Sequence, residues 1–311
     1  MTVDNRVKFG MAIPQIFAVP QADTAALRAF LTRAEALGFH SVWVQEQILG
    51  RGMASLEPVA LLSYAAAMTR SLRLGSAVFL TLLRNPVQLA KSLATVDQLS
   101  NGRLIVGVGL GANTRIYPAF GLLPEGRVRR FTEGLALIKR LWTEERVTFD
   151  GEFWKLEGAS MAPKPVQQPH PPIWFGAGAP AALKRAVELG DGWIGAGSSS
   201  AGGFRERVQQ VRALLAEAGR DPKTFPIAKR VYLAVDSDKA RGLGRLRRWF
   251  DSYYGSAGLA DRVALVGDAR EIVAGLRETR AAGADLLLLN PVFDEMEQLE
   301  LLAREIVPAI D

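Results

Sequence analysis

Two glycine-rich stretches are the parts of this sequence best suited to hold an anion. They are FGAGAP at 175–180 and GAGSSS at 195–200, and each follows an apolar run and precedes a helix-forming segment. Successive free backbone N–H groups, with the positive end of a helix behind them, form a nest for a phosphate group, and serine hydroxyls add donors. Ordinary tight turns between a strand and a helix are the alternative explanation. The candidate nest residues are Gly176, Ala177, Gly178, Gly195, Ala196, Gly197, Ser198 and Ser199.

Few residues in this chain are placed to transfer a proton. The apolar run that ends in VWVQEQ puts Glu46 and Gln47 at its exit, where Glu46 can orient a ligand, act as acid or base, or serve as a surface or capping group. The chain has no cysteine and two histidines, His40 before an apolar run and His170 among prolines, so neither is placed for catalysis. Because no Ser-His-Asp set or metal cluster can be assembled, we expect a bound organic cofactor to supply the chemistry.

Composition argues against several other classes of protein. At 311 residues and 49% hydrophobic content, the chain can bury a large core. Its net charge of +6 comes from 38 Lys and Arg scattered among 32 Asp and Glu, which does not form a nucleic-acid-binding tract. The N-terminal MTVDNRVKFG lacks an apolar signal region, and no stretch reaches the roughly 18 to 20 apolar residues that a membrane helix needs. We expect a cytoplasmic protein that binds neither nucleic acid nor membrane.

The elements that must position these residues recur with a fixed period. Four short apolar runs start at 7, 40, 72 and 103, spacings of 33, 32 and 31 residues, which is the length of one buried strand plus a crossover helix. Helical patterns lie between them at 24–37, 57–68 and 86–99. The first four predicted strands are VKFGMAI (7–13), HSVWVQ (40–45), LRLGSAVFL (72–80) and RLIVGVG (103–109).

Four further strands bring the total to eight. Unbroken apolar runs of this kind are typical of strands buried on both faces. Eight strands alternating with helices over about 300 residues predict a single (β/α)8 TIM barrel that spans residues 1–311. The later strands are predicted at 172–178, 192–197, 227–235 and 285–292.

Two intervals are too long for the barrel period and are predicted as insertions. The segment at about 146–171, after the fourth helix, indicates a small hairpin that turns at Asp150–Gly151 and continues as a proline-rich connection. The segment at about 237–261 follows the seventh strand. Long insertions in a barrel often serve as lids or binding walls.

A third glycine pattern, GVGLGA at 107–112, matches the fingerprint of a dinucleotide-binding turn. That fingerprint belongs to the first strand of its fold with a helix directly behind it. Here it follows the fourth strand, and Tyr117–Pro118 opposes an immediate helix, so we interpret the match as accidental. The glycines instead let a flat ligand approach the carboxyl end of the strand, where barrel active sites lie. The candidates there are Gly109, Gly111 and Asn113.

Several of these segments together resemble the bacterial luciferase-like monooxygenase family. The similar stretches are ALGFHSVWVQE (36–46), RNPVQLAKSLATVDQLSNGRLIVGVGLG (84–111), LWTEERVTFDGEFWKLEG (141–158) and PPIWFGAG (171–178). The resemblance covers nearly the whole chain, and its most specific part is the segment 72–111.

The resemblance implies a TIM barrel that binds FMN or the deazaflavin coenzyme F420 across its mouth, with the phosphate near the fifth and sixth strands. It implies a non-prolyl cis peptide at Ala77–Val78, cradling the middle ring, and a binding or catalytic role for the acid at Glu46. It also implies a homodimer, for which the helices after the second and third strands are candidate contact surfaces. A separate coenzyme reductase is a possible partner.

Two positions depart from the family pattern. Gln47 stands where the alcohol-oxidising deazaflavin enzymes have a proton-accepting histidine, and Ala112 stands where an acid is often found. Neither side chain accepts a proton, so reduction of an activated C=C or C=N bond in a small apolar substrate is favoured. The alternatives are a monooxygenase that receives FMNH2 from a reductase, and a flavin-binding barrel without turnover.

Overall fold

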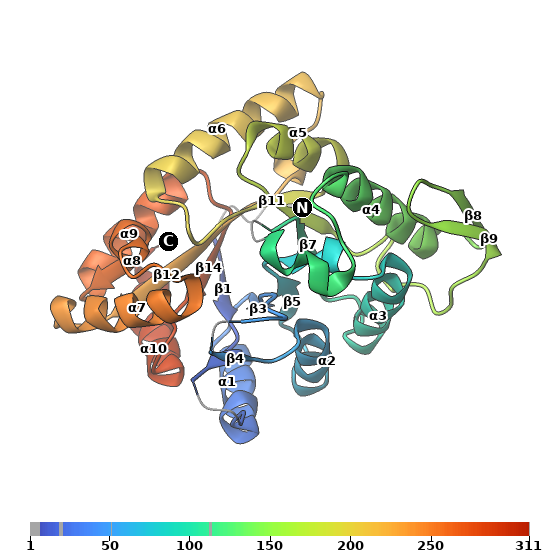
Figure 1. Cartoon of the computed structure of the whole chain (residues 1–311). Coiled ribbons are helices and arrows are strands. Elements are labelled where there is room, and N and C mark those ends of the chain that lie inside the picture. Colours follow the sequence, from blue (N-terminus) through green and yellow to red (C-terminus); the bar gives the residue numbers. More distant parts are fainter. Residues whose placement is uncertain (1–6, 19–20, 51, 112–113, 311) are drawn as a thin grey trace.

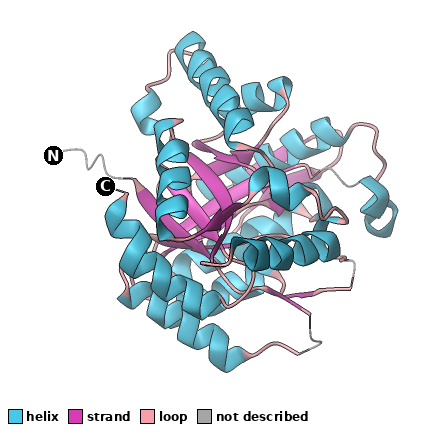
Figure 2. Ribbon diagram, turned by 90° about the vertical axis from the view of Figure 1, so that its left-hand side faces the viewer, coloured by secondary structure: helices cyan, strands magenta, loops and turns pink. Residues whose placement is uncertain are grey.

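Eight parallel strands form a closed barrel in the computed structural model, which describes residues 7–18, 21–50, 52–111 and 114–310. Each strand pairs with its neighbour in the order β10-β11-β12-β14-β1-β3-β5-β7, and pairing of β7 with β10 closes the ring. The predicted TIM barrel is therefore confirmed, and Figure 2 shows the strands running through the centre of the molecule inside the helices. The barrel strands are β1 (Lys8–Ala12), β3 (Ser41–Val44), β5 (Arg73–Ser76), β7 (Leu104–Gly109), β10 (Ile173–Gly176), β11 (Gly192–Gly195), β12 (Ile227–Val235) and β14 (Leu286–Asn290).

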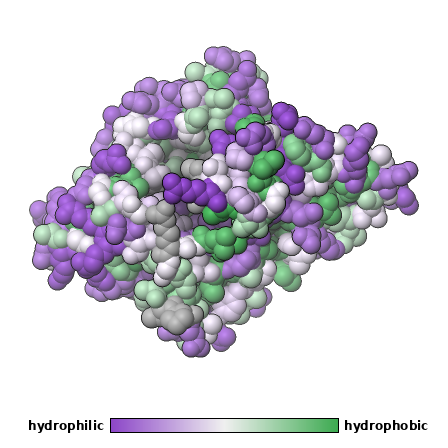
Figure 3. All heavy atoms as spheres, in the orientation of Figure 1, coloured by the Kyte–Doolittle hydropathy of each residue, from purple (hydrophilic) through white to green (hydrophobic). Residues whose placement is uncertain are grey.

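The helices surround this barrel (Figure 1). Among the described residues, no helix is long and apolar enough to cross a membrane. On the face shown in Figure 3, hydrophilic residues cover most of the periphery and hydrophobic residues form smaller groups between them. The helices are α1 (Thr24–Ala36), α2 (Pro58–Met68), α3 (Pro86–Leu99), α4 (Arg127–Thr143), α5 (Pro180–Leu189), α6 (Ala201–Glu217), α7 (Lys239–Tyr254), α8 (Leu259–Val263), α9 (Ala269–Ala281) and α10 (Glu295–Leu301).

Two tryptophans fill the inside of the barrel. The ring centroids of Trp43 on β3 and Trp174 on β10 lie 5.7 Å apart, and both side chains are buried. Neighbouring strands carry glycine where these indoles pass: a Cβ added to Gly75 would lie 2.2 Å from Trp43, and one added to Gly192 would lie 2.8 Å from Trp174. The barrel interior is thus a packed core that closes the floor of the mouth.

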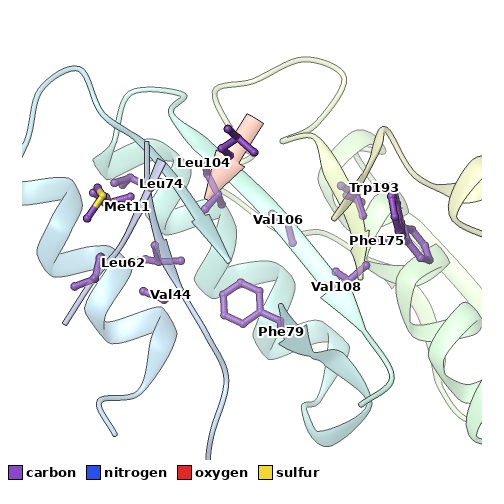
Figure 4. Packing of buried hydrophobic residues seen from close by; sticks show 14 of the residues in the cluster. Met11, Val44, Leu62, Leu74, Phe79, Leu104, Val106, Val108, Phe175 and Trp193 are labelled. Atoms are coloured by element: carbon purple, nitrogen blue, oxygen red, sulfur yellow. The ribbon is translucent and has the colours of Figure 1, made fainter. Parts of the chain in front are cut away.

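A second core lies between the strands and the helices. On β7, Leu104, Val106 and Val108 alternate with Ile105, which faces the barrel interior. Figure 4 shows the first three among the side chains that pack with Phe79 and Phe175. This period of two explains why the strand is continuously apolar in sequence, since both of its faces are buried.

Both predicted insertions form ordered structure. The first contains a hairpin of β8 (Val147–Asp150) and β9 (Lys155–Ala159), in which Asp150 pairs with Lys155, followed by the proline-rich connection. The second contains α7 and α8. The remaining short strands are β2 (Ile16–Phe17), β4 (Ala54–Ser55), β6 (Phe79–Leu80) and β13 (Leu265–Gly267).

The third predicted strand (72–80) is one element in sequence but two in the structure. It divides into β5 and β6 at a cis peptide bond between Ala77 and Val78, as the family resemblance implies. After β7 the chain forms the 3-10 helix η2 (Thr114–Phe120), which contains Pro118, and no α-helix begins in the described residues until Arg127. This agrees with the interpretation that the glycine pattern at 107–112 is not a dinucleotide-binding turn.

His40 lies at the amino end of β3, opposite the mouth, and we expect it to make the stability of the fold sensitive to acid. Burial, together with the charges of Lys8 and Arg73, lowers its pKa to about 4. Between its ordinary pKa of 6.5 and about 4 the unfolded chain binds a proton that the folded chain does not, so stability falls with pH in this window. We expect the wild type to lose about 2–3 kcal/mol of unfolding free energy from this group, and His40→Gln to abolish that loss.

Urea unfolding at pH 4, 5 and 6.5 measures this difference. His170→Gln is the matched control, because His170 lies in the proline-rich connection, where its ring donates to the neighbouring Pro171 carbonyl and contacts the Trp142 ring. Parallel pH profiles for wild type and His40→Gln would show that the acid sensitivity arises elsewhere.

Candidate functional site

A cleft of about 1000 Å³ lies at the carboxyl ends of the barrel strands. It brings together the strand exits that the sequence singled out, from β5, β7, β10 and β11. Asn113 was predicted with them and lies outside the described residues. The predicted residues that line the cleft are Ala77, Val78, Gly109, Gly111, Gly176, Ala177, Gly178, Gly195, Ala196, Gly197, Ser198 and Ser199.

The amino ends of two helices line this cleft. Ala179 is the N-cap of α5 and makes no side-chain capping bond, whereas Ser200 caps α6 by accepting from the Gly203 N–H at 3.2 Å. The first N–H groups of a helix have no partner inside the helix, and the helix dipole adds positive potential there. The β10–α5 loop (177–179) and the β11–α6 loop (196–200) therefore lie side by side at two helix amino ends, an arrangement typical of anion-binding sites.

The serines of the β11–α6 loop are not equivalent. The Ser199 hydroxyl donates to the Ala196 carbonyl at 2.7 Å, and the Ser200 hydroxyl oxygen is used in the helix cap. Ser198 is exposed, and no described residue hydrogen-bonds its hydroxyl. The Ser198 hydroxyl is therefore free, and the Ser200 hydroxyl, which only accepts in the cap, keeps its proton for a ligand.

Val78 occupies the space that two strand-end glycines leave open. A Cβ added to Gly109 would lie 2.8 Å from Val78, and one added to Gly176 would lie 3.0 Å from it. Gly107 serves packing alone, since a Cβ there would lie 1.8 Å from the Ser76 carbonyl oxygen. The glycines of β7 thus let the chain at Ala77–Val78 rise into the mouth of the barrel.

The cleft is strongly cationic. Five arginines and one acid, Glu206, line it. Arg207 links α6 to the β10–α5 loop, because it donates to the Gly178 carbonyl at 3.1 Å and, one turn back in its own helix, to the Gly203 carbonyl at 2.7 Å. The lining arginines are Arg127, Arg185, Arg207, Arg230 and Arg262.

A buried lysine supports the β11–α6 loop from below. Lys229 on β12 donates to the carbonyls of Ala196 and Ser199, the second at 2.9 Å, and to the Ser199 hydroxyl at 3.0 Å. Burial lowers its pKa to about 7, and the charges of Arg230 and Arg207 act in the same direction. Its acceptors are neutral, so an anion bound in the loop above it would favour its charged form.

Arg230 lies on the same strand and points into the mouth. Its guanidinium donates to the Asn290 side-chain oxygen at 2.7 Å, to Gln45 and to the Ala77 carbonyl at 3.5 Å. It also lies 4.8 Å from the centre of the Tyr232 ring. Strand β12 therefore contributes two consecutive buried basic residues, of which Lys229 reaches the β11–α6 loop and Arg230 the barrel mouth.

Sequence reasoning missed both of these cations. The run IAKRVYLAV was correctly predicted as a strand over 227–235, but its two charged residues were not considered. The signal was present, because Lys and Arg are rarely buried without a partner and a central barrel strand is buried on both faces.

Glu46 does not line the cleft. Its buried carboxylate accepts from the Leu80 N–H and from Arg84, whose Nε lies 2.7 Å away, and Arg84 also binds Glu57. The predicted acid–base and cofactor-contacting roles therefore have no support in this geometry, because the carboxylate is committed to an ion pair. The contact joins the exit of β3 to β6 and so fixes the segment that carries Ala77–Val78.

Gln47 also lies away from the cleft lining. Its side-chain oxygen is buried without a hydrogen-bond partner among the described residues, and its amide lies close to Gly50. A direct part for Gln47 in the chemistry stays a prediction.

The second insertion forms one wall of the cleft. Tyr254 at the end of α7 and Arg262 and Val263 of α8 line it. The Tyr254 hydroxyl lies 2.9 Å from that of Tyr232, and burial raises the pKa of Tyr232 well above its usual range. The end of the predicted insertion and the two residues after it thus form a wall of the cleft, and a ligand-binding role for this wall stays a prediction.

The fold and site define a TIM barrel with an arginine-lined cleft at the carboxyl ends of its strands. A family model described as luciferase-like monooxygenase matches residues 7–286. The chain therefore belongs to the luciferase-like monooxygenase family, a family of oxidoreductases.

Three similar proteins have names that describe oxidoreductases. F420-dependent glucose-6-phosphate dehydrogenase from Kineococcus radiotolerans is 35% identical over 230 residues, which cover 72% of this chain and 68% of that protein. 5,10-methylenetetrahydromethanopterin reductase from Archaeoglobus fulgidus is 29% identical over 242 residues, covering 77% and 68%. The crystal structure of monooxygenase RslO1 from Streptomyces bottropensis has a TM-score of 0.83 and 27% identity, covering 98% of this chain and 100% of that one.

Proposed function

We propose that this protein is an F420-dependent oxidoreductase that transfers a hydride between the deazaflavin C5 and a small apolar substrate. The observation that carries the proposal is the charge of the cleft, where five arginines face one acid and two helix amino ends converge. F420 bears a phosphate followed by glutamyl carboxylates, so it presents more negative charge than FMN. A cationic cleft of this extent suits the longer anionic tail.

The residues present fit the phosphate of either coenzyme. The loops at 177–179 and 196–200 offer backbone donors and the Ser198 hydroxyl, and Arg207 of α6 holds the 177–179 loop. Gly197 leaves no room for a side chain, because a Cβ there would lie 2.7 Å from the Tyr232 ring. When bound, the deazaflavin would supply or accept the hydride at its C5.

The chain's own contribution is binding, orientation and electrostatics. Leu80, Leu110 and Phe131 give the cleft an apolar side suited to a small apolar substrate. Glu46 is held by Arg84, and Gln47 and Ala112 cannot accept a proton, so the one carboxylate of the described lining is Glu206 of α6, beside the β11–α6 loop that we assign to the phosphate. Reduction of an activated C=C or C=N bond is therefore the favoured direction.

A second candidate function is a monooxygenase that receives FMNH2 from a separate reductase. The likeness to the monooxygenase from Streptomyces bottropensis over nearly the whole chain favours it. The two functions differ in the coenzyme bound and in the use of oxygen.

Anaerobic titration of the purified protein with F420 and with FMN tests the proposal. We expect F420 to bind at least about tenfold more tightly, with an affinity that falls more steeply as salt rises. Reduced F420 should then be oxidised in a panel of activated alkenes and imines without oxygen. Exclusive binding of FMN with oxygen-dependent product formation would replace this function with the second, and binding without turnover would leave a flavin-binding barrel.

We also propose that the protein is a homodimer that joins through α2 and α3. A groove of about 890 Å³ runs between these helices, lined by Val59 and Ala60 of α2 and by Val87 and Gln88 of α3. Analytical ultracentrifugation measures the oligomeric state of wild type and of Ala60→Arg. We expect a dimeric wild type and a monomeric variant, and a monomeric wild type would refute the proposed dimer.

A further inference from the structure

The floor of the barrel mouth carries one charged side chain among the described residues that line it, Arg230. The floor is formed where Gln15, Gln45 and Asn290 converge below the cleft, and it is otherwise made of apolar and amide groups. Arg230 is 8% exposed, and it lines both the floor and the cleft above it. A ring lying across the mouth would therefore contact the charged guanidinium of Arg230.

No carboxylate in the described part of the chain pairs with Arg230. Its acceptors are the amide oxygens of Gln45 and Asn290 and the Ala77 carbonyl. The nearest charged neighbour on the strand is Lys229, also a cation, and the nearby acid Glu46 is bound to Arg84. A guanidinium stays charged when buried, and a buried charge without a counter-ion is costly. The positive charge of Arg230 thus lacks a counter-ion until an anion binds above the floor.

The guanidinium is held in place before any ligand binds. The side chain of Gln45 accepts from Arg230, and its backbone is fixed by the side chain of Gln15. The Gln45 backbone N–H donates to the Gln15 side-chain oxygen at 2.8 Å, and the Gln15 side-chain amide donates to the Gln45 backbone carbonyl at 2.7 Å. Gln15 also donates to the Leu56 carbonyl at 2.6 Å. Groups fixed in this way need no rearrangement to stabilise charge, which makes their effect larger.

We propose that Arg230 is an electrostatic residue that stabilises negative charge on the ring system of the bound cofactor. This inference rests on the proposed function, since it requires a ring with an acidic group. The ring of F420 carries an acidic hydroxyl, and that of FMN an acidic imide. A fixed cation at the floor favours the ionised form of either ring and so lowers its pKa.

The test is a pH titration of the absorbance of bound F420 in the wild type and three variants. Arg230→Met removes the cation, and Gln45→Glu keeps the shape of its partner while placing a carboxylate against it. Both should raise the pKa of the bound ring by about one pH unit or more. Arg230→Lys should keep the pKa of the bound ring close to its wild-type value, because lysine retains the positive charge.

The outcomes separate this inference from the proposed function. F420 that binds all four proteins with one and the same ring pKa would overturn the role of Arg230 and leave the proposed function intact. If FMN alone binds, the same titration is followed on the flavin imide with the same expected order. If neither coenzyme binds the wild type, the proposed function fails and the inference fails with it. Gln45→Glu guards against a folding defect, since it changes one atom of the side chain.

Discussion

Replacing Gly178 with aspartate is expected to weaken F420 binding by at least about 100-fold, whereas replacing it with alanine is expected to change binding by less than about threefold. A Cβ at this position meets only the Arg207 side chain, at 3.5 Å, so alanine fits without strain. Aspartate places a carboxylate in the loop at the amino end of α5 and offers Arg207 an internal partner. The carboxylate repels a bound phosphate, and its pairing with Arg207 removes a cation that would otherwise attract the phosphate.

Fluorescence or calorimetric titration of the two variants measures the difference. Because both variants add the same Cβ, the ratio of their affinities isolates the charge. Equal affinities for Gly178→Asp and Gly178→Ala would show that the anion binds away from the β10–α5 loop.

Lys229 is expected to make the free protein more stable as pH rises above neutrality. Its pKa in the folded protein is about 7, below the ordinary value of 10.5, so in this window the unfolded chain binds a proton that the folded chain does not. The wild type should therefore gain about 4 kcal/mol of unfolding free energy from this group between pH 7 and 10.5. Lys229→Met should lack that gain.

The comparison uses the difference in unfolding free energy between wild type and Lys229→Met at several pH values, because other groups titrate in both proteins. Lys223→Met is the control, since Lys223 is exposed at the start of a short 3-10 helix. A difference between wild type and Lys229→Met that stays constant with pH would mean that Lys229 keeps its ordinary pKa in the folded protein.

The barrel was predictable because its signal is periodic and each strand is buried on both faces. The starts of the first four strands, 31 to 33 residues apart, implied one strand and one helix per unit, and the structure places all eight strands in that parallel order. The boundaries of β12 and α3 agree with the prediction to the residue. The division of 72–80 into β5 and β6 followed only from the family resemblance, since the run is continuously apolar.

The candidate site was predictable where backbone forms it. Glycines at the exits of β7, β10 and β11 marked the cleft, because a close approach to backbone has a clear sequence signature. Side chains that act across the barrel have no such local signature. Arg230 reaches Gln45, which is 185 residues away in sequence, and Glu46 turns away from the mouth toward Arg84, so neither arrangement follows from neighbouring residues.

The measurement that tests this account most directly is a crystal structure of the protein with F420. The account predicts that the coenzyme phosphate lies between the β10–α5 and β11–α6 loops, within hydrogen-bonding distance of their backbone amides, and that the ring crosses the mouth above Arg230. A phosphate bound elsewhere, with both loops empty, would contradict it.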